Sequence, residues 1–426
     1  MNAPFNPTPS VALPDAYAAG VQRLPLAAPV RVLALGAFLK NTACWLDGDR
    51  VHWRPSGLLA AGDSHGDLRD PQACAALQTS VQALIDLADQ AEQTGLATIQ
   101  AVAHDLHPDF FSTHCALEVA ERLGVPAVGV AHHHAHLGVV MAEQGWRTHE
   151  GDPVLGLALD GVGLGPDGTA WGGEALCIEG GQMRRVGTLP ALALPGADAA
   201  AVAPWRLRLS VAHALGLDVQ DASLRGAIPP AQVSGVAQML ARGLNCPATT
   251  AAGRWFDAMA ALLGLCEVQQ HEAQAALALQ SAAQAAVVAG GDTSAVLPPA
   301  ADPASDDAWW ALMRQALALG QTARSRPTGS ESLQAEINTA ALAFHRLLAA
   351  RLVALLEAEA HKLYGPGPGP VRVALGGGCF FNPLLRDDVL QQGQARGWRM
   401  ALPRQVSCGD AGLALGQAWV AAGLLA

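Results

Sequence analysis

Short apolar segments that stop abruptly at polar or glycine-rich turns recur along the chain, and they constrain its fold more than any other feature. Four such segments are residues 99–104, 125–130, 154–159 and 371–375. Longer stretches such as 71–96 and 331–363 carry apolar residues three and four positions apart, which is typical of helices. Alternating strands and helices predict an α/β fold whose ligands bind at the carboxyl ends of the strands.

Two of these strand ends carry residue types that bind metal ions. His132 and His136 follow the strand 125–130 and are four residues apart, so on a helix they share one face. Two imidazoles one turn apart can bind one ion at ~2.0–2.1 Å each. Solvated or buried core histidines have the same spacing. Asp160 favours the metal interpretation, because it ends the strand 154–159 just before a glycine-rich turn, where a carboxylate can meet a metal or a phosphate.

Other strand ends favour anion binding. Strand 371–375 is followed by three glycines and by a helix that begins near Asn382, and such a turn directs backbone N–H groups and the helix dipole at one point. Lys40 and Asn41 follow a strand at 30–35, where they are either a phosphate contact or a solvated loop pair. Gly253 can let the backbone approach a ligand.

Composition excludes several classes of partner. The net charge of −11 argues against general nucleic-acid binding, and no apolar run reaches the ~20 residues that cross a bilayer. The eight cysteines are scattered without a C-x-x-C pair, and the N-terminus has no basic region followed by an apolar one. We therefore expect a cytoplasmic protein with reduced thiols and neither a nucleic-acid nor a membrane partner.

The order of the motifs resembles one family. The chain contains, in sequence, H-x-x-x-H, D-G-x-G-x-G-x-D-G-x-x-W-G-G-E, G-R-x-F-D-A, E-x-Q-A-A, G-G-x-F-x-N and G-D-x-G-L-A-L-G-Q. Together they resemble the C-terminal portion of the HypF carbamoyltransferases of nickel–iron hydrogenase maturation, from about residue 28 to 426. The phrases DLHPDF-x-ST and LPG-x-DAAA-x-x-PW are similar to HypF and not to the related tRNA threonylcarbamoyl transferases.

The resemblance implies an actin-like (ASKHA) two-lobed α/β fold with a nucleotide and metal site in the cleft between the lobes. It implies a first lobe over 27–150 completed by the helix 408–426, and a second lobe over 151–407, while the Pro- and Ala-rich composition of 1–26 predicts a flexible tail there. The residues that match the family's metal ligands, which would also be the catalytic residues, are His132, His136, Asp160 and Asp410. The expected nucleotide-binding residues are Lys40, Asn41, Gly161, Gly163, Arg254, Asp257, Glu272, Gly377, Gly378 and Asn382.

The resemblance also implies a reaction. The family transfers a carbamoyl group, made from carbamoyl phosphate and ATP through carbamoyl-adenylate, to the C-terminal cysteine of its partner HypE, where it becomes a cyanide ligand of the hydrogenase iron. Two histidines and two carboxylates suit Fe(II) or Zn(II), and the sequence does not choose between them. Mg²⁺ is a further candidate ion.

Departures from the family pattern leave alternatives open. The acylphosphatase, zinc-finger and YrdC-like domains of complete HypF proteins are not recognisable, so carbamoyl-adenylate would come from a separate protein or from an unrecognised activity here. Ala37-Phe38, Ala273 and Gly409 replace the family's Gly-Glu, Gly and Asn. Other readings are an O-carbamoyltransferase for small molecules, a tRNA threonylcarbamoyl transferase, or a nucleotide-binding scaffold for HypE without turnover. Cys379 and Cys408 lie beside two of these motifs, and each is either a nucleophile or a packing residue.

Overall fold

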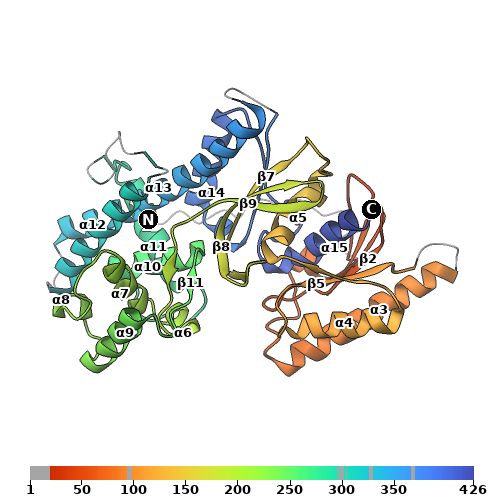
Figure 1. The fold of residues 1–426 in the computed structure, drawn as a ribbon, viewed down its shortest axis with the longest axis horizontal. Coiled ribbons are helices and arrows are strands. Elements are labelled where there is room, and N and C mark those ends of the chain that lie inside the picture. Colours follow the sequence, from red (N-terminus) through yellow and green to blue (C-terminus); the bar gives the residue numbers. More distant parts are fainter. Residues whose placement is uncertain are drawn as a thin grey trace, which may run out of the picture. The chain divides into compact units, whose positions relative to one another are not determined.

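The chain folds into two compact α/β units (Figure 1). The computed structural model describes residues 20–93, 98–294, 296, 302–303, 305–325, 330–365 and 370–426. Unit 1 comprises the chain up to Val130, Ala142–Gly145 and Arg404–Ala426, and unit 2 comprises Ala131–Met141 and Trp146–Pro403. Most of the predicted turn at 366–370 and part of the predicted loop at 290–306 lie outside the described residues.

Unit 1 is built on a mixed six-stranded sheet. Its strands are β1 (Val21–Arg23), β2 (Val32–Ala34), β3 (Ala43–Asp47), β4 (Arg50–Arg54), β5 (Ala101–Asp105) and β6 (Ala127–Val130), in the order β1-β4-β3-β2-β5-β6. β2, β5 and β6 are parallel, and β1, β4, β3 and β2 are joined antiparallel. The predicted hairpin is present as β3 and β4, with Gly48 at a φ of 58° in the turn between them.

Helices cover both faces of this sheet. The helices of unit 1 are α2 (Leu58–Ala61), α3 (Pro71–Gln93), α4 (Phe111–Leu123) and α15 (Leu413–Leu424). α3 packs on β3 and β4 and α4 on β5, whereas α15 crosses β2, β3 and β5 (Figure 1). Every residue of α15 from Leu413 to Ala422 is buried, which explains why this helix is apolar apart from Gln417, whose amide is bonded to the backbone of Gly36.

The tail predicted over residues 1–26 is too long, because Val21–Arg23 is a strand paired with β4. Gln22 at its centre is fully buried, and the indole Nε1 of Trp53 donates to Gln22 Oε1 at 3.0 Å. A buried polar side chain is stable only with such a partner. Because the buried central residue of this strand is polar, the sequence V-Q-R lacks the alternation of apolar and polar residues that marks a strand. The strand could therefore not be recognised from the sequence.

Unit 2 is built on a seven-stranded sheet. Its strands are β7 (Val154–Leu164), β8 (Ala170–Glu179), β9 (Gln182–Thr188), β10 (Leu192–Ala193), β11 (Ala248–Thr249), β12 (Arg372–Gly376) and β13 (Arg399–Ala401), in the order β10-β11-β8-β7-β12-β13 with β9 beside β8. β7 pairs antiparallel with β8 and parallel with β12. The expected glycine turn at 161–168 is shorter than predicted, since β7 continues through an irregularity to Leu164.

Helices make up most of the rest of unit 2. They are α6 (Asp198–Val202), α7 (Trp205–Ala214), α8 (Ala222–Arg225), α9 (Pro230–Arg242), α10 (Ala252–Leu262), α11 (Gln274–Val288), α12 (Asp306–Ser325), α13 (Glu331–Tyr364) and α14 (Pro383–Ala395). The helix α5 (His132–Gln144) contributes His132–Met141 to unit 2 and its last residues to unit 1, although the sequence placed all of 27–150 in one lobe.

Within the described ranges, α13 alone has the length and apolar composition of a membrane-crossing helix. It packs against α11, α12 and α14, and 72% of its most apolar window is buried inside the protein. Its apolar character is therefore explained by its place in the core of unit 2.

Candidate metal and nucleotide site

Two buried imidazoles begin helix α5, directly after strand β6. The exposed fractions of His132 and His136 are 5% and 1%, and their ring centroids lie 4.9 Å apart at a steep angle. The four-residue spacing places them on one face, as the sequence predicts. His133 and His134 are buried as well, and burial lowers the pKa of His134 to about 4.

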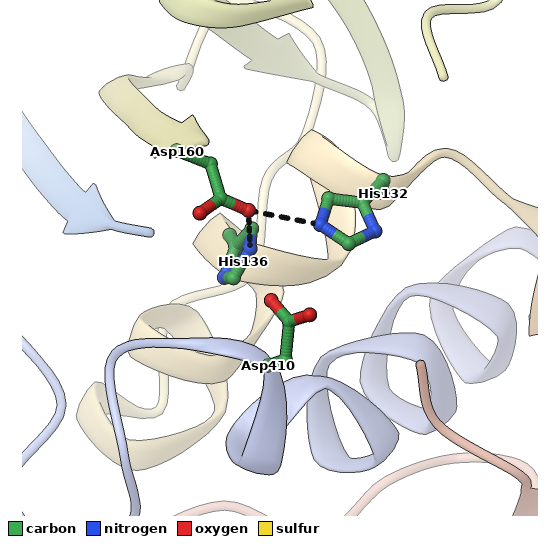
Figure 2. Close-up of side chains that lie close together, drawn as sticks. All are labelled: His132, His136, Asp160 and Asp410. Carbon is green, nitrogen blue, oxygen red and sulfur yellow. Dashed lines mark hydrogen bonds and ion pairs between the residues drawn. The ribbon is translucent and has the colours of Figure 1, made fainter. Parts of the chain in front are cut away.

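The carboxylate of Asp160 lies between these imidazoles (Figure 2). Its Oδ2 lies 3.2 Å from Nε2 of His132 and 3.3 Å from Nε2 of His136. Its Oδ1 accepts a hydrogen bond of 2.8 Å from the backbone N–H of Gly161. Burial raises the pKa of Asp160, but hydrogen bonds and positive charge from the two imidazoles outweigh burial and hold that pKa well below its usual value.

This geometry fits a metal centre. Two ligand atoms that each lie ~2.0–2.1 Å from one ion in a tetrahedron are about 3.4 Å apart, close to the two observed separations from Asp160 Oδ2. One ligand atom each from His132, His136, Asp160 and Asp410 lies within 4.8 Å of the others (Figure 2). Asp410 opens the short 3₁₀ turn η2 (Asp410–Gly412) just before α15. Two nitrogens and two carboxylate oxygens suit Fe(II) or Zn(II).

Two glycines pack closely against His132 and His136. A Cβ on Gly163 would lie 2.7 Å from Cδ2 of His132, and one on Gly376 would lie 2.7 Å from the carbonyl oxygen of His136. Gly163 lies within strand β7, where it pairs with Trp171. Its bare Cα is thus needed for the packing of His132, and the N–H of Gly161 is already bonded to Asp160.

The glycines at and after the end of β12 pass over the middle of β7. Gly377 has a φ of 103°, and a Cβ on it would lie 2.2 Å from the carbonyl oxygen of Leu159. A Cβ on Gly378 would lie 3.2 Å from Asp160 Oδ1. Three of the predicted nucleotide-binding residues, Gly161, Gly377 and Gly378, therefore lie against Asp160 or its neighbour Leu159.

Arg254 and Asp257 form an ion pair in the first turns of α10. Nη2 of Arg254 lies 2.8 Å from Oδ2 of Asp257, one helical turn away. Burial raises the pKa of Asp257 to about 6, although the charge of Arg254 lowers it in part. A Cβ on Gly253 would lie 2.8 Å from Cα of Gly161, so the helix start that carries Arg254 packs directly on the residue after Asp160.

Asn382 caps helix α14. Its Oδ1 accepts hydrogen bonds from the backbone N–H groups of Leu384 and Leu385, and its Nδ2 lies 2.9 Å from Nε2 of His345. Burial lowers the pKa of His345 to about 4, and its Nδ1 lies 2.8 Å from the carbonyl oxygen of Ala341. A neutral His345 that donates from Nδ1 accepts from Asn382 at Nε2, so the amide of Asn382 is occupied within the protein.

Asn41 is also occupied by internal hydrogen bonds, within unit 1. Its fully buried amide donates to the carbonyl oxygens of Leu35 and Ala37, and its Oδ1 lies 2.8 Å from Nδ1 of His65. The interpretation of a solvated loop pair is therefore wrong for Asn41. The loop that it fixes holds Lys40 at a φ of 47°, a conformation that a non-glycine residue adopts only where its surroundings impose it.

The departures from the family pattern have local explanations in two cases. Phe38 stacks on Phe110 with ring centroids 4.8 Å apart, so an apolar contact stands at the position of the family's acidic residue. Ala273 has a φ of 60°, which glycine would adopt without steric cost. Glu272 is exposed in the segment before α11, and nothing in the structure explains Gly409.

A buried ion pair in β8 and β9 was not among the predicted residues. Glu174 is fully buried, its Oε2 lies 2.6 Å from Nε of Arg185, and its Oε1 accepts from the backbone N–H of Gly172. Arg185 also lies 4.3 Å from the ring centroid of Trp171. Glu174 ends the W-G-G-E phrase and could have been singled out, whereas Arg185 has no local signal.

Comparisons with known proteins indicate the same family along most of the chain. Residues 27–143 match the family model described as "HypF Kae1-like domain", and residues 156–417 match "Carbamoyltransferase, Kae1-like Domain, second subdomain". The chain is 46% identical over 398 residues to "Carbamoyltransferase HypF homolog" of Cupriavidus necator, covering 92% of this chain and 91% of that protein.

Longer relatives match over about half of their length. "Carbamoyltransferase HypF2" of Cupriavidus necator is 40% identical over 92% of this chain and 46% of its own. A solved structure described as "Crystal structure of full-length HypF in the phosphate- and nucleotide-bound form" superposes with a TM-score of 0.71 at 24% identity, covering 96% of this chain and 48% of that one. This likeness shows that the fold is the predicted actin-like α/β fold.

Proposed function

Because this chain belongs to the carbamoyltransferase HypF family, we propose that it transfers a carbamoyl group during the maturation of nickel–iron hydrogenase. The donor is carbamoyl-adenylate, formed from carbamoyl phosphate and ATP, and the acceptor is the C-terminal cysteine of HypE. The reaction takes place in the cytoplasm, where thiols stay reduced. The observation that carries the proposal is the meeting of His132 and His136 at Asp160 in a chain of this family.

A divalent ion is assigned to His132, His136, Asp160 and Asp410. When bound there, Fe(II) or Zn(II) supplies Lewis-acid chemistry for the carbonyl and phosphate oxygens of the donor. The chain's own contribution is to keep the ligands ready. The low pKa of Asp160 keeps its carboxylate ionised at neutral pH, and burial of the imidazoles excludes water that would hydrolyse the donor.

The transfer itself needs no nucleophile from this chain. The thiolate of HypE attacks the carbamoyl carbon, a C–S bond forms, and the bond from that carbon to the phosphate oxygen breaks, so that AMP leaves with the electron pair. The thiol proton passes to solvent. Arg254, held by Asp257 beside Gly161, is assigned to the phosphate of the leaving AMP, together with the backbone at Gly377 and Gly378.

The remaining expected contacts follow from their positions. Lys40, presented by the loop that Asn41 fixes, is assigned to the nucleotide phosphates, and the exposed Glu272 to the ribose. Asn41, Asn382 and Gly163 are assigned indirect roles, because their side chains or their bare Cα already hold neighbouring protein groups. A separate protein that forms carbamoyl-adenylate is a proposed further partner.

The test is a mass measurement on HypE. The protein is incubated with HypE, ATP and carbamoyl phosphate, and in a second arm with a YrdC-like adenylate-forming protein added. We expect HypE to gain the mass of one carbamoyl group in the second arm at least. His136→Ala abolishes the gain, whereas His213→Ala, at an exposed position of α7 in the same unit, leaves it unchanged.

Two outcomes contradict the proposal. HypE of unchanged mass in both arms, with a stable complex, makes the protein a binding scaffold and not a transferase. Full transfer by the His136→Ala variant removes the imidazole from the reaction. Carbamoylation of a small hydroxyl compound, with no effect on HypE, would place the chain with the small-molecule carbamoyltransferases instead.

A further inference from the structure

The last turn of α5 ends in a carboxylate that holds another segment of unit 1. The Oε2 of Glu143 accepts a hydrogen bond of 2.5 Å from the backbone N–H of Arg404, and its Oε1 accepts from the N–H groups of Gln405 and Val406, both at 3.1 Å. Three successive backbone amides thus converge on one side chain. Such an array is an anion site, here filled by the protein's own glutamate.

A second contact orients the same carboxylate from the opposite end of the chain. The side-chain Nε2 of Gln22 in β1 lies 3.4 Å from Glu143 Oε1, and Gln22 is itself fixed by the indole of Trp53. Gln22 is fully buried. Glu143 is therefore held from two sides, by strand β1 and by the segment Arg404–Val406, and all these residues belong to unit 1.

The position of Glu143 is unfavourable for the helix alone. A negative charge in the last turn of a helix opposes the helix dipole. Burial raises the pKa of Glu143, while the amides of Arg404, Gln405 and Val406 lower it. The backbone amides of Arg404, Gln405 and Val406 stabilise the carboxylate at this position. Glu143 in turn fixes the segment that carries these amides.

That segment leads directly to Asp410. Val406 is followed by a tight turn in which Ser407 Oγ accepts from the N–H of Gly409, and Gly412 donates its N–H to the carbonyl oxygen of Gly409. A Cβ on Gly412 would lie 2.3 Å from the carbonyl oxygen of Ser407, so the turn has little freedom of its own. Thr42 Oγ1 donates to the carbonyl oxygen of Ala411 at 2.9 Å, just after Asp410, and Glu143 holds the segment where it enters the turn.

We propose that Glu143 is a positioning residue for Asp410, which it presents as a metal ligand by fixing Arg404–Val406 to the end of the helix that begins with His132 and His136. This inference rests on the metal centre of the proposed function. Residues that orient a ligand without touching the metal typically change metal affinity ~10–100-fold when they are replaced. Glu143 touches no ligand side chain, so its effect depends on the presence of the Asp410 carboxylate.

A double-mutant cycle on Zn²⁺ affinity tests this dependence. Zn²⁺ dissociation constants are measured by competition with a chelating dye for the wild type, Glu143→Gln, Asp410→Asn and the double variant. We expect Glu143→Gln to weaken Zn²⁺ binding at least ~10-fold in the wild type and less than ~2-fold in the Asp410→Asn background. Glu121→Gln, at an exposed position in the last turn of α4, is the matched control and leaves the Zn²⁺ affinity unchanged.

Amide hydrogen exchange supplies a readout that does not depend on the metal. In the metal-free protein, Glu143→Gln speeds exchange at residues 404–410, whereas β7 and the first turns of α5 keep their protection. If the Glu143 variant does not fold, Gln22→Met gives a milder loosening of the same carboxylate and the same pattern at smaller size.

The outcomes separate this inference from its premise. Equal losses of Zn²⁺ affinity in both backgrounds, or no loss in either, overturn the positioning role while the metal centre stands. If Asp410→Asn binds Zn²⁺ as tightly as the wild type, Asp410 is not a ligand, and both the four-residue centre and the role of Glu143 are overturned.

Discussion

Asp160 is a half-buried and Asp257 a buried carboxylate of unit 2, and their pKa values move in opposite directions. Burial raises both. Asp160 receives two imidazoles and the N–H of Gly161, which more than offset burial, whereas Asp257 has only the partly exposed Arg254. The number of donors around a buried carboxylate therefore decides its charge. Asp160 stays an anion fit for a cation, and Asp257 changes charge near pH 6.

The largest effect is expected from removing the charge of Asp160. Asp160→Asn keeps the shape of the side chain but removes an anionic ligand from between two imidazoles. We expect Zn²⁺ affinity and carbamoyl transfer to fall together by more than ~100-fold, measured by competition titration and by the mass of HypE. Asp257→Asn is the matched variant, and it keeps Zn²⁺ affinity within about 2-fold if the two carboxylates differ in role as described.

The second prediction concerns stability against pH. The pKa of Asp257 is about 6 in the folded protein and about 3.9 in the unfolded chain, so between these values the folded state binds more protons. Its contribution to stability is therefore fully present below pH 4 and is lost as pH rises to 6. Asp257→Asn should reduce the fall in unfolding free energy between pH 4 and 7 by about 3 kcal/mol, measured by urea denaturation at each pH.

An identical pH dependence of the wild type and the Asp257→Asn variant would contradict this account of Asp257. Asp160→Asn gives the opposite sign, since the pKa of Asp160 is depressed in the folded protein. The stability from Asp160 is present above its unfolded pKa near 3.9 and is lost as pH falls towards its folded value.

Two glycines in β7 provide a test of how the position of His132 affects metal binding. A Cβ on Gly163 would lie 2.7 Å from a ring carbon of His132, whereas a Cβ on Gly161 would meet nothing within 4 Å. Gly163→Ala should therefore displace His132 and weaken Zn²⁺ binding ~10-fold, and Gly161→Ala should leave it unchanged. Equal affinities for the two variants would show that the position of His132 does not depend on this contact.

The smallest effect is expected at Ala273. Its φ of 60° is costly for alanine, so Ala273→Gly relieves strain but gives the unfolded chain more freedom, and we expect a gain of at most about 1 kcal/mol. Ala276→Gly, inside α11, should instead lose about 1 kcal/mol. Chemical denaturation of both variants measures the difference, and a loss at Ala273 equal to that at Ala276 would contradict the backbone strain.

Much of the fold could be predicted from local patterns. The hairpin β3–β4, the part of strand β7 that leads to Asp160, and the long helix α13 follow from apolar periodicity and turn residues. Strand β1 could not be found, because its central Gln22 is buried through a hydrogen bond to Trp53, thirty-one residues away. Helix α12 was not predicted, although Trp309, Leu312, Met313 and Ala316 in it have helical spacing.

Residue type and spacing were enough to find the candidate metal ligands. The internal contacts of the other site residues depend on the three-dimensional structure and could not be predicted. His132, His136 and Asp160 were found by spacing and by position at a strand end, and the structure brings them together. The sequence could not show that Asn41 and Asn382 hold backbone groups and neighbouring histidines. It also could not show that Gly163 serves packing, because both functions need the same residue type.

X-ray absorption of the Zn²⁺-loaded protein tests the metal centre most directly. The account predicts one tightly bound ion with two imidazole nitrogens and carboxylate oxygens at ~2.0–2.2 Å, and a spectrum that loses one imidazole in the His136→Ala variant. A sulfur ligand at ~2.3 Å, from Cys379 or Cys408, or a spectrum unchanged by His136→Ala, would contradict it.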